Sequence, residues 1–128
     1  MKIDHVAIYT ANFERARHFY CDHFGFRAGE RYQSASKPFE SYFLEAESGA
    51  RLELMWREGL EPRATNNGEL TGISHIALNL GSQQAVVAMF ERLQGAGCRV
   101  VSGPRQTGDG YFEACVYDLD GNRIEVTA

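Results

Sequence analysis

Two histidines and two glutamates occupy matching places in two repeated motifs of this 128-residue chain. His5 opens the segment His-Val-Ala-Ile, and His75 opens His-Ile-Ala-Leu. Glu53 lies in Gly-Ala-Arg-Leu-Glu-Leu, and Glu125 lies in Gly-Asn-Arg-Ile-Glu-Val. Imidazole and carboxylate groups together suit one divalent ion, and zinc, nickel, cobalt, manganese and iron all accept such ligands. An ion with one or two open positions would act as a Lewis acid on a substrate bearing adjacent oxygens.

The repeat itself predicts how the chain is organised. The two histidines are 70 residues apart and the two glutamates 72, which indicates duplication of a unit of about 60 residues. Because a unit of that size rarely buries a full core alone, the two copies are expected to pair. We predict a single domain with module one at residues 1–58, a linker at 59–72 and module two at 73–128.

In module one, alternation over residues 3–9 predicts a strand. Apolar residues recur every three to four positions from Phe13, which predicts a helix with Asn12 at its N-cap and Gly25 as its stop. Three further strands are expected at approximately residues 26–33, 39–45 and 51–56.

Module two follows the same plan. Residues 73–80 predict a strand, and Ser82 is the expected N-cap of a helix that Gly95 and Gly97 close. Three strands are expected at approximately residues 98–102, 111–117 and 123–127, with turns at 108–110 and 118–122. Each module therefore has the order β-α-β-β-β, which predicts an α+β fold.

Strand alternation predicts which way the candidate ligands point. Val6 and Ile8 supply an apolar face for the helix, which leaves His5 on the other face. Leu52 and Leu54 leave Glu53 opposite in the same way, and module two repeats the pattern. If the two sheets curl toward each other, this uncovered face becomes a cleft. Taken singly, however, a strand histidine is more often a hydrogen-bonded surface residue, and such a glutamate is usually the wet side of a strand.

Composition narrows the classes of partner. A net charge of −4 without a Lys/Arg block argues against a nucleic-acid surface, and no apolar stretch is long enough to span a bilayer. Cys21, Cys98 and Cys115 are odd in number and lack metal-type spacing, which favours reduced thiols. We therefore expect a cytoplasmic protein that acts on a small molecule.

Several segments resemble the glyoxalase I, bleomycin-resistance and extradiol-dioxygenase group, the vicinal oxygen chelate superfamily. The ending Asp-Leu-Asp-Gly-Asn-Arg-Ile-Glu is similar to the family's Asp-Pro-Asp-Gly-x-x-Ile/Leu-Glu pattern, with Leu119 in place of the proline. The other segments that carry the resemblance are His5-Val-Ala-Ile, Phe19-Tyr20, Phe24-Gly25-Phe26, Arg51-Leu-Glu53-Leu and His75-Ile-Ala-Leu. The resemblance implies tandem βαβββ modules that form a curved mixed sheet around a cleft.

Among the family's activities, the set His5, Glu53, His75 and Glu125 resembles glyoxalase I most closely. That likeness implies a metal-dependent lyase or isomerase that acts on a small α-hydroxycarbonyl or hemithioacetal-like substrate through an enediolate. Glu125 is then the first choice for the catalytic base and Glu53 the second. Tyr9 stands where glutathione-using members carry an arginine.

Other activities of the superfamily stay open. Epimerases usually carry Gln where Glu53 stands, and dioxygenases use two His and one Glu, matching His5, His75 and Glu125. Members of the bleomycin-resistance type bind small drug molecules and generally lack the ligands. Short members form homodimers, which implies sites at the subunit interface with ligands from both chains.

The remaining candidates would shape the substrate pocket. The predicted substrate-binding residues are Tyr9, Arg57, Asn79 and Tyr111. Tyr111 follows the segment Thr-Gly-Asp-Gly, which predicts either a lid or an ordinary hairpin turn followed by core aromatic residues. Arg51 and Arg123 share the ligand face, where they either contact the substrate or pair with nearby carboxylates.

Overall fold

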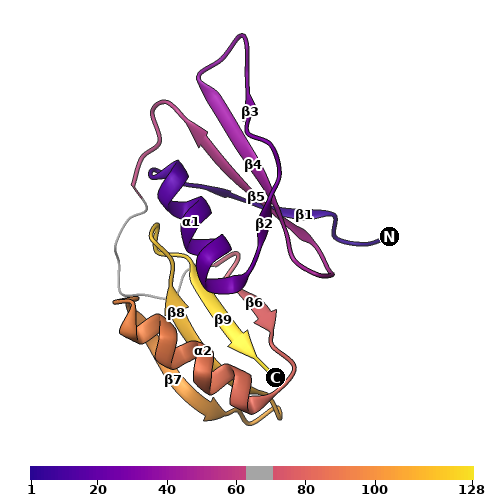
Figure 1. The fold of residues 1–128 in the computed structure, drawn as a ribbon, viewed down its shortest axis with the longest axis vertical. Coiled ribbons are helices and arrows are strands. Elements are labelled where there is room, and N and C mark those ends of the chain that lie inside the picture. Colours follow the sequence, from indigo (N-terminus) through magenta and orange to yellow (C-terminus); the bar gives the residue numbers. More distant parts are fainter. Residues whose placement is uncertain (63–70) are drawn as a thin grey trace. The chain divides into compact units, whose positions relative to one another are not determined.

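The computed structural model describes residues 1–62 and 71–128. The chain divides into two compact units, Met1–Arg63 and Ala64–Ala128, and each unit contains one helix and one mixed sheet (Figure 1). The fold is therefore α+β with two βαβββ-like units, as predicted. Most of the predicted linker, residues 63–70, lies outside the described residues.

The sheet of the first unit has the strand order β1-β5-β4-β2, and β3 also pairs with β4. Strands β1 and β5 are parallel, which places His5 opposite Arg51 and Ala7 opposite Glu53. The other pairs are antiparallel. The elements are β1 (His5–Tyr9), α1 (Phe13–Phe24), β2 (Arg27–Ala28), β3 (Tyr32–Gln33), β4 (Phe39–Glu45) and β5 (Arg51–Arg57).

The sheet of the second unit has the order β6-β9-β8-β7. Its parallel pair, β6 and β9, places His75 opposite Arg123 and Ala77 opposite Glu125, which repeats the register of the first unit. The elements are β6 (His75–Asn79), α2 (Gln83–Gly95), β7 (Val100–Gln106), β8 (Phe112–Tyr117) and β9 (Arg123–Thr127).

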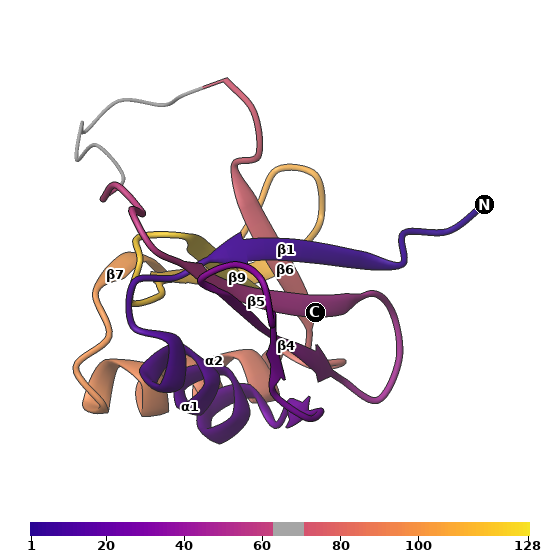
Figure 2. The ribbon, with the colours of Figure 1, turned by 90° about the horizontal axis from the view of Figure 1, so that it is seen from above.

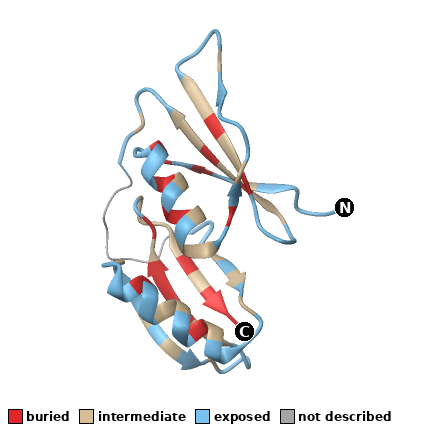
Figure 3. Cartoon of the chain, viewed as in Figure 1, coloured by how far each residue is buried: buried red, intermediate tan, exposed pale blue. Residues whose placement is uncertain are grey.

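Each helix packs on one face of its own sheet, as Figure 2 shows for α1 beside β5. Leu54 in β5 and Ile124 in β9 are fully buried on these covered faces. In Figure 3 the buried residues gather on the strands and along one side of each helix. Burial of this apolar surface is the main stabilising contribution to the fold, about 1.5–3 kcal/mol for each large aliphatic side chain.

The two helix starts differ. The side chain of Ser82 accepts a hydrogen bond from the Ala85 N–H at 3.2 Å, so this predicted N-cap is confirmed. Asn12 occupies the N-cap position of α1, but its side chain makes no capping hydrogen bond. Its backbone conformation, φ −115° and ψ 72°, is not the extended one of Ser82, and its N–H is instead bound by the hydroxyl of Thr10 at 3.2 Å.

Most predicted strands match the observed ones to within two residues at each end, and two differ more. The segment expected as one strand at 26–33 forms two short strands, because the register against β4 shifts by one residue between Ala28, which pairs with Leu44, and Tyr32, which pairs with Ser41. The strand expected at 98–102 begins later, at Val100, and runs on to Gln106. It begins later because the Cys98 N–H still bonds to Leu93 at the end of α2.

Two expectations from composition can be compared with the structure. All three cysteines are free thiols, as expected. Within the described residues, no helix is long and apolar enough to cross a membrane.

Candidate active site

In the first unit, His5 and Glu53 project from neighbouring strands on the face that α1 leaves uncovered. The register sets both on the predicted face, and His5 Nε2 lies 3.8 Å from Glu53 Oε2. The Glu53 side chain is only 14% exposed, whereas that of His5 is 40% exposed. The His5 side chain is therefore partly open to solvent beside a largely buried carboxylate.

The other ring nitrogen of His5 is held by Asp4. His5 Nδ1 donates to Asp4 Oδ2 at 2.9 Å, and Arg51 donates to the same oxygen at 2.6 Å. These two hydrogen bonds, that of His5 first, lower the pKa of Asp4 to about 2. Because a carboxylate can only accept, the neutral ring carries its proton on Nδ1 and its lone pair on Nε2. Metal-binding histidines commonly have such a partner on the second nitrogen.

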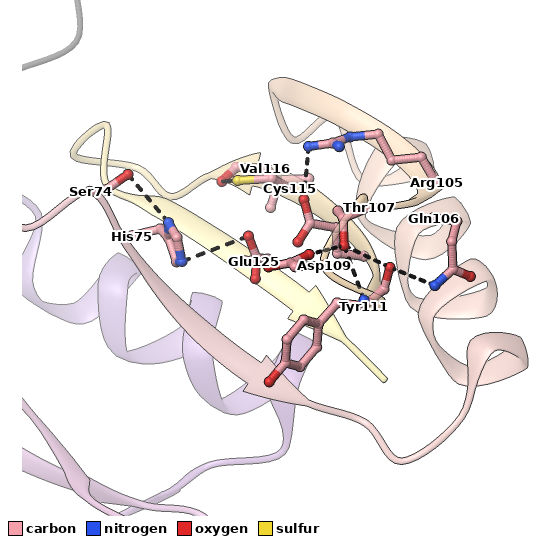
Figure 4. Close-up of polar contacts among 11 residues, drawn as sticks. Ser74, His75, Arg105, Gln106, Thr107, Asp109, Tyr111, Cys115, Val116 and Glu125 are labelled. Atoms are coloured by element: carbon pink, nitrogen blue, oxygen red, sulfur yellow. Dashed lines mark hydrogen bonds and ion pairs between the residues drawn. The ribbon is translucent and has the colours of Figure 1, made fainter.

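The second unit repeats this arrangement with a different partner. His75 Nε2 lies 3.7 Å from Glu125 Oε2, and the two side chains are 41% and 15% exposed. In Figure 4 the two groups point toward one another. His75 Nδ1 contacts the hydroxyl of Ser74 at 3.3 Å, a weaker partner than the carboxylate of Asp4.

The spacing within each pair fits a shared ion. Metal–nitrogen and metal–oxygen bonds to these ligand types are about 2.1 Å long, so two ligands of one ion lie at most about 4.2 Å apart. The distances of 3.8 Å and 3.7 Å satisfy that limit. Each unit thus supplies one imidazole and one carboxylate in suitable geometry.

Within each unit the structure brings one histidine and one glutamate side by side. Among residues 1–62 and 71–128, no group of three or more His, Cys, Asp and Glu side chains forms a metal-type cluster. The convergence of His5, Glu53, His75 and Glu125 on one ion stays a prediction, and each pair is a property of its own unit.

The surroundings of Glu125 raise the pKa of its carboxyl. Burial raises the pKa of this carboxyl, the charge of His75 opposes the rise, and the nearby Glu113 adds to it. Cys115 stands directly opposite Glu125 on β8, and burial, with the charge of Glu125, raises the pKa of its thiol to about 11. The thiol is therefore protonated and unreactive at neutral pH.

The predicted pocket residues of the first unit lie on the expected face. Tyr9 is 47% exposed and follows His5 and Ala7 along β1. Arg57 ends β5, and its Nε donates to the Glu58 carbonyl at 3.5 Å. Arg51 lies with its guanidinium 4.4 Å from the centre of the Phe43 ring and pairs with Asp4, which bears out the alternative that it pairs with a carboxylate.

In the second unit, Asn79 and Tyr111 have defined local roles. The side-chain carbonyl of Asn79 accepts from the Gly81 N–H at 2.8 Å, so it closes the turn after β6. Tyr111 follows a hairpin turn that Thr107 and Gln106 hold together with hydrogen bonds to the Tyr111 backbone, as Figure 4 shows. The segment forms a hairpin turn, as one alternative predicted, but the Tyr111 that follows it is exposed and is not a core aromatic residue. The action of this segment as a lid stays a prediction. The ring of Tyr111 is 53% exposed.

Sequence reasoning missed the residues that flank each pair across the strands. Phe43 contacts His5 edge-on at 5.4 Å between ring centres, and Cys115 occupies the matching place beside Glu125. Glu113 binds Arg105 at 2.8 Å. Their contacts depend on strand register, and the only available signal was their alternation with buried residues on β4 and β8.

Known proteins place the chain in a family. The model described as Glyoxalase/Bleomycin resistance protein/Dioxygenase superfamily matches residues 2–126. No curated protein sequence matches the chain.

Solved structures show the same fold. Glyoxalase I from Zea mays has a TM-score of 0.81 and 18% identity, with 98% of this chain and 44% of that chain covered. A glyoxalase family protein from Enterococcus faecalis has a TM-score of 0.79 and 23% identity over 99% and 97% of the two chains. A trypanothione-dependent glyoxalase I from Leishmania major has a TM-score of 0.75 and 21% identity over 98% and 85%.

These similarities agree with the fold. At such identities the likeness to solved structures extends to the fold alone, and this chain spans less than half the length of the maize enzyme. The family model, in contrast, covers nearly the whole chain, and the chain belongs to the Glyoxalase/Bleomycin resistance protein/Dioxygenase superfamily.

Proposed function

We propose that this chain is a metal-dependent lyase or isomerase of the glyoxalase type, acting on a small α-hydroxycarbonyl or hemithioacetal-like substrate through an enediolate. The observation that carries the proposal is the repeated His–Glu pair, with Nε2–Oε2 distances of 3.8 Å and 3.7 Å in the two units. A pure binding protein has no need for two such pairs. The superfamily includes enzymes such as glyoxalase I, and its members commonly bind a divalent metal.

Four residues would hold the ion: His5, Glu53, His75 and Glu125. Their chemistry suits zinc, nickel, cobalt, manganese or iron, and the ligand types do not choose among these metals. When bound, such an ion polarises the substrate carbonyl and stabilises the negative charge that develops on its oxygen. We expect sites at the interface of a homodimer, in which one chain supplies His5 and Glu53 and its partner supplies the other two.

The chain's own residues would move the proton. Glu125, released from the ion, would take the proton from the hydroxyl-bearing carbon next to the substrate carbonyl and return it to the former carbonyl carbon. The isomerisation is complete when the hydroxyl proton has passed to the former carbonyl oxygen. Glu53 is the second candidate for this role. Burial of both carboxylates, which are 14% and 15% exposed, keeps bulk water away from the reacting atoms. We expect this chemistry in the cytoplasm.

The proposal is tested by loading the purified protein with each candidate metal and assaying hemithioacetals and a panel of α-hydroxycarbonyl compounds. Turnover should require metal and should stop when a chelator removes it. In Glu125→Gln we expect substrate binding to persist while kcat falls by about 10²–10⁴-fold, the usual contribution of a general base.

The matched control is Glu53→Gln, which removes a carboxylate from the equivalent place in the first unit. It should lower metal affinity and turnover less than Glu125→Gln does. Undiminished turnover in Glu125→Gln would rule out the assignment of the base. Metal-free protein that binds small drug molecules tightly and turns over none of the panel would instead favour the bleomycin-resistance type.

A further inference from the structure

Four polar side chains form a row across the second sheet, next to the His75–Glu125 pair. The register places Arg105 opposite Glu113, Glu113 opposite Thr127, and Thr127 opposite Asn79. Thr127 lies two residues beyond Glu125 on β9, so both side chains leave the same face of the strand. We call this set the polar row.

Thr127 is the unusual member of the polar row. The residue is 6% exposed, and its hydroxyl oxygen is buried without a hydrogen-bond partner among the described residues. Native proteins pair nearly all buried polar groups, because an unpaired one has lost its hydration without replacement. We therefore expect the hydroxyl of Thr127 to form a hydrogen bond with a group that is not among the described residues.

A second buried threonine shows the ordinary case. Thr10 is 1% exposed, and its hydroxyl oxygen accepts a hydrogen bond from the Asn12 N–H at 3.2 Å. Its polar atom is used to begin α1. No comparable local structure uses the hydroxyl of Thr127 among the described residues.

The neighbours of Thr127 have the donors and acceptors that a hydroxyl group needs. Arg105 binds one carboxylate oxygen of Glu113 at 2.8 Å, and the Glu113 carboxyl also contacts the side chain of Glu125, which fixes its position. Each carboxylate oxygen has two lone pairs, so the group keeps an acceptor position for a further donor. A ligand hydroxyl can donate to such a carboxylate and at the same time accept from the hydroxyl of Thr127. The side-chain carbonyl of Asn79 is engaged by Gly81, so Asn79 offers its amide N–H groups.

The equivalent row of the first unit is chemically different. The register there aligns Tyr9 with Met55, Met55 with Ser41, and Ser41 with Tyr32. Met55 occupies the place of Thr127, and Ser41 the place of Glu113. The row beside Glu125 thus contains the charged pair Arg105 and Glu113, whereas the row beside Glu53 contains no charged side chain among its described residues.

We infer that Thr127 and Glu113 bind a hydroxyl group on the substrate carbon next to the reacting α-hydroxycarbonyl, so that Thr127 determines specificity for polyhydroxylated over deoxy substrates. The inference rests on the proposed function. A site that hydrogen-bonds a substrate hydroxyl rejects the analogue without it, because its own polar groups are then left buried and unpaired.

Glyceraldehyde and lactaldehyde are a matched pair of probes, since they differ only in the hydroxyl on C3. Their conversion to dihydroxyacetone and hydroxyacetone is followed with the protein loaded with Ni²⁺ and, in parallel, with Zn²⁺. We expect kcat/KM to favour glyceraldehyde by at least about 10-fold in the unmodified protein. Thr127→Val should abolish this preference, and Thr127→Ser, which keeps the hydroxyl, should restore it. Binding of both aldehydes is measured in parallel by saturation-transfer NMR.

Equilibrium unfolding without any aldehyde gives a second, substrate-independent test. Because Thr127 gains nothing from its hydroxyl inside the described chain, Thr127→Val should leave the unfolding midpoint unchanged or raise it. The matched control Thr10→Val should lower the midpoint, since it removes an acceptor that is in use. A lower midpoint in Thr127→Val would show a structural role and overturn the inference.

The outcomes separate the inference from the proposed function. Turnover of both aldehydes with equal kcat/KM, or an equal effect of Thr127→Val on both, would overturn the inference and leave the isomerase in place. Preferential binding of glyceraldehyde without turnover would leave the inference in place and remove the isomerase. Binding of neither aldehyde to the metal-loaded protein would overturn the inference.

Discussion

The two units have the same backbone plan, and their uncovered sheet faces differ. In both, a parallel strand pair sets a histidine beside a glutamate, at 3.8 Å in the first unit and 3.7 Å in the second. Across the sheet from the glutamate, however, the first unit has Phe43 and the second has Cys115. The register of the parallel strand pair, which sets the histidine beside the glutamate, is thus the same in both units. The residues on the next strand differ.

This divergence shows what each unit contributes. The first unit surrounds its histidine with the ring of Phe43, the guanidinium of Arg51 and the carboxylate of Asp4. The second offers the polar row and a half-buried Glu125 whose pKa burial raises. Two equivalent carboxylates in unequal surroundings are suited to unequal roles, which agrees with Glu125 as the proposed base and Glu53 as a ligand.

The largest expected effects concern the helix-covered faces of the two sheets, where both units should have a packed apolar core. Leu54 and Val126 occupy matching places on the helix-covered faces and are 0% and 1% exposed. Leu54→Ala should lower the free energy of unfolding by about 2–5 kcal/mol, because it leaves a cavity under α1. Val126→Ala should cost less, since it deletes fewer buried atoms.

Urea denaturation followed by circular dichroism measures both changes. A loss of under about 1 kcal/mol in Leu54→Ala would mean that the covered face of the first unit is not a packed core.

The partners of the two histidines should differ in what they contribute to metal affinity. Asp4 accepts from His5 at 2.9 Å as a carboxylate, whereas Ser74 contacts His75 at 3.3 Å as a hydroxyl. Asp4→Ala should weaken metal binding by about 10–100-fold, the usual effect of losing an outer-shell partner. Ser74→Ala should have a smaller effect.

Competition with a chelating dye at fixed pH measures the two affinities. Equal losses of metal affinity in Asp4→Ala and Ser74→Ala would contradict this prediction. They would show that a carboxylate and a hydroxyl partner support a metal-binding histidine equally.

The smallest effect distinguishes the two helix starts. Ser82→Ala removes a side-chain hydrogen bond to the Ala85 N–H and should cost about 1 kcal/mol of stability. Asn12→Ala removes a side chain that makes no capping bond and should change stability little. Thermal unfolding of the two variants measures the difference, and a larger loss in Asn12→Ala would contradict the observed cap geometry.

The helices and strands, and the sheet face on which each strand residue lies, could be predicted from the sequence because both follow from local periodicity. Alternation predicted that His5 and Glu53 lie on one face of the sheet and that Val6 and Leu52 lie on the other. The strand register in the structure agrees with this prediction. The predicted cap at Ser82 and the stop at Gly25, which has φ 72°, depend on single residues and were also readable.

Contacts between strands could not be read in this way. That Cys115 faces Glu125, or that Thr127 faces Glu113, depends on register, which local pattern does not set. The break between β2 and β3 likewise depends on a one-residue shift of register against β4. The polar row was therefore visible only in the structure.

The number of divalent ions bound per chain tests the central claim most directly, because each unit supplies only half of the proposed ligand set. Titration of metal-free protein with Zn²⁺, followed by calorimetry and elemental analysis, should give one ion per chain. His5→Ala and His75→Ala should each abolish tight binding of that ion. Two independent ions per chain, each lost in only one of the variants, or no tightly bound ion at all, would contradict the account.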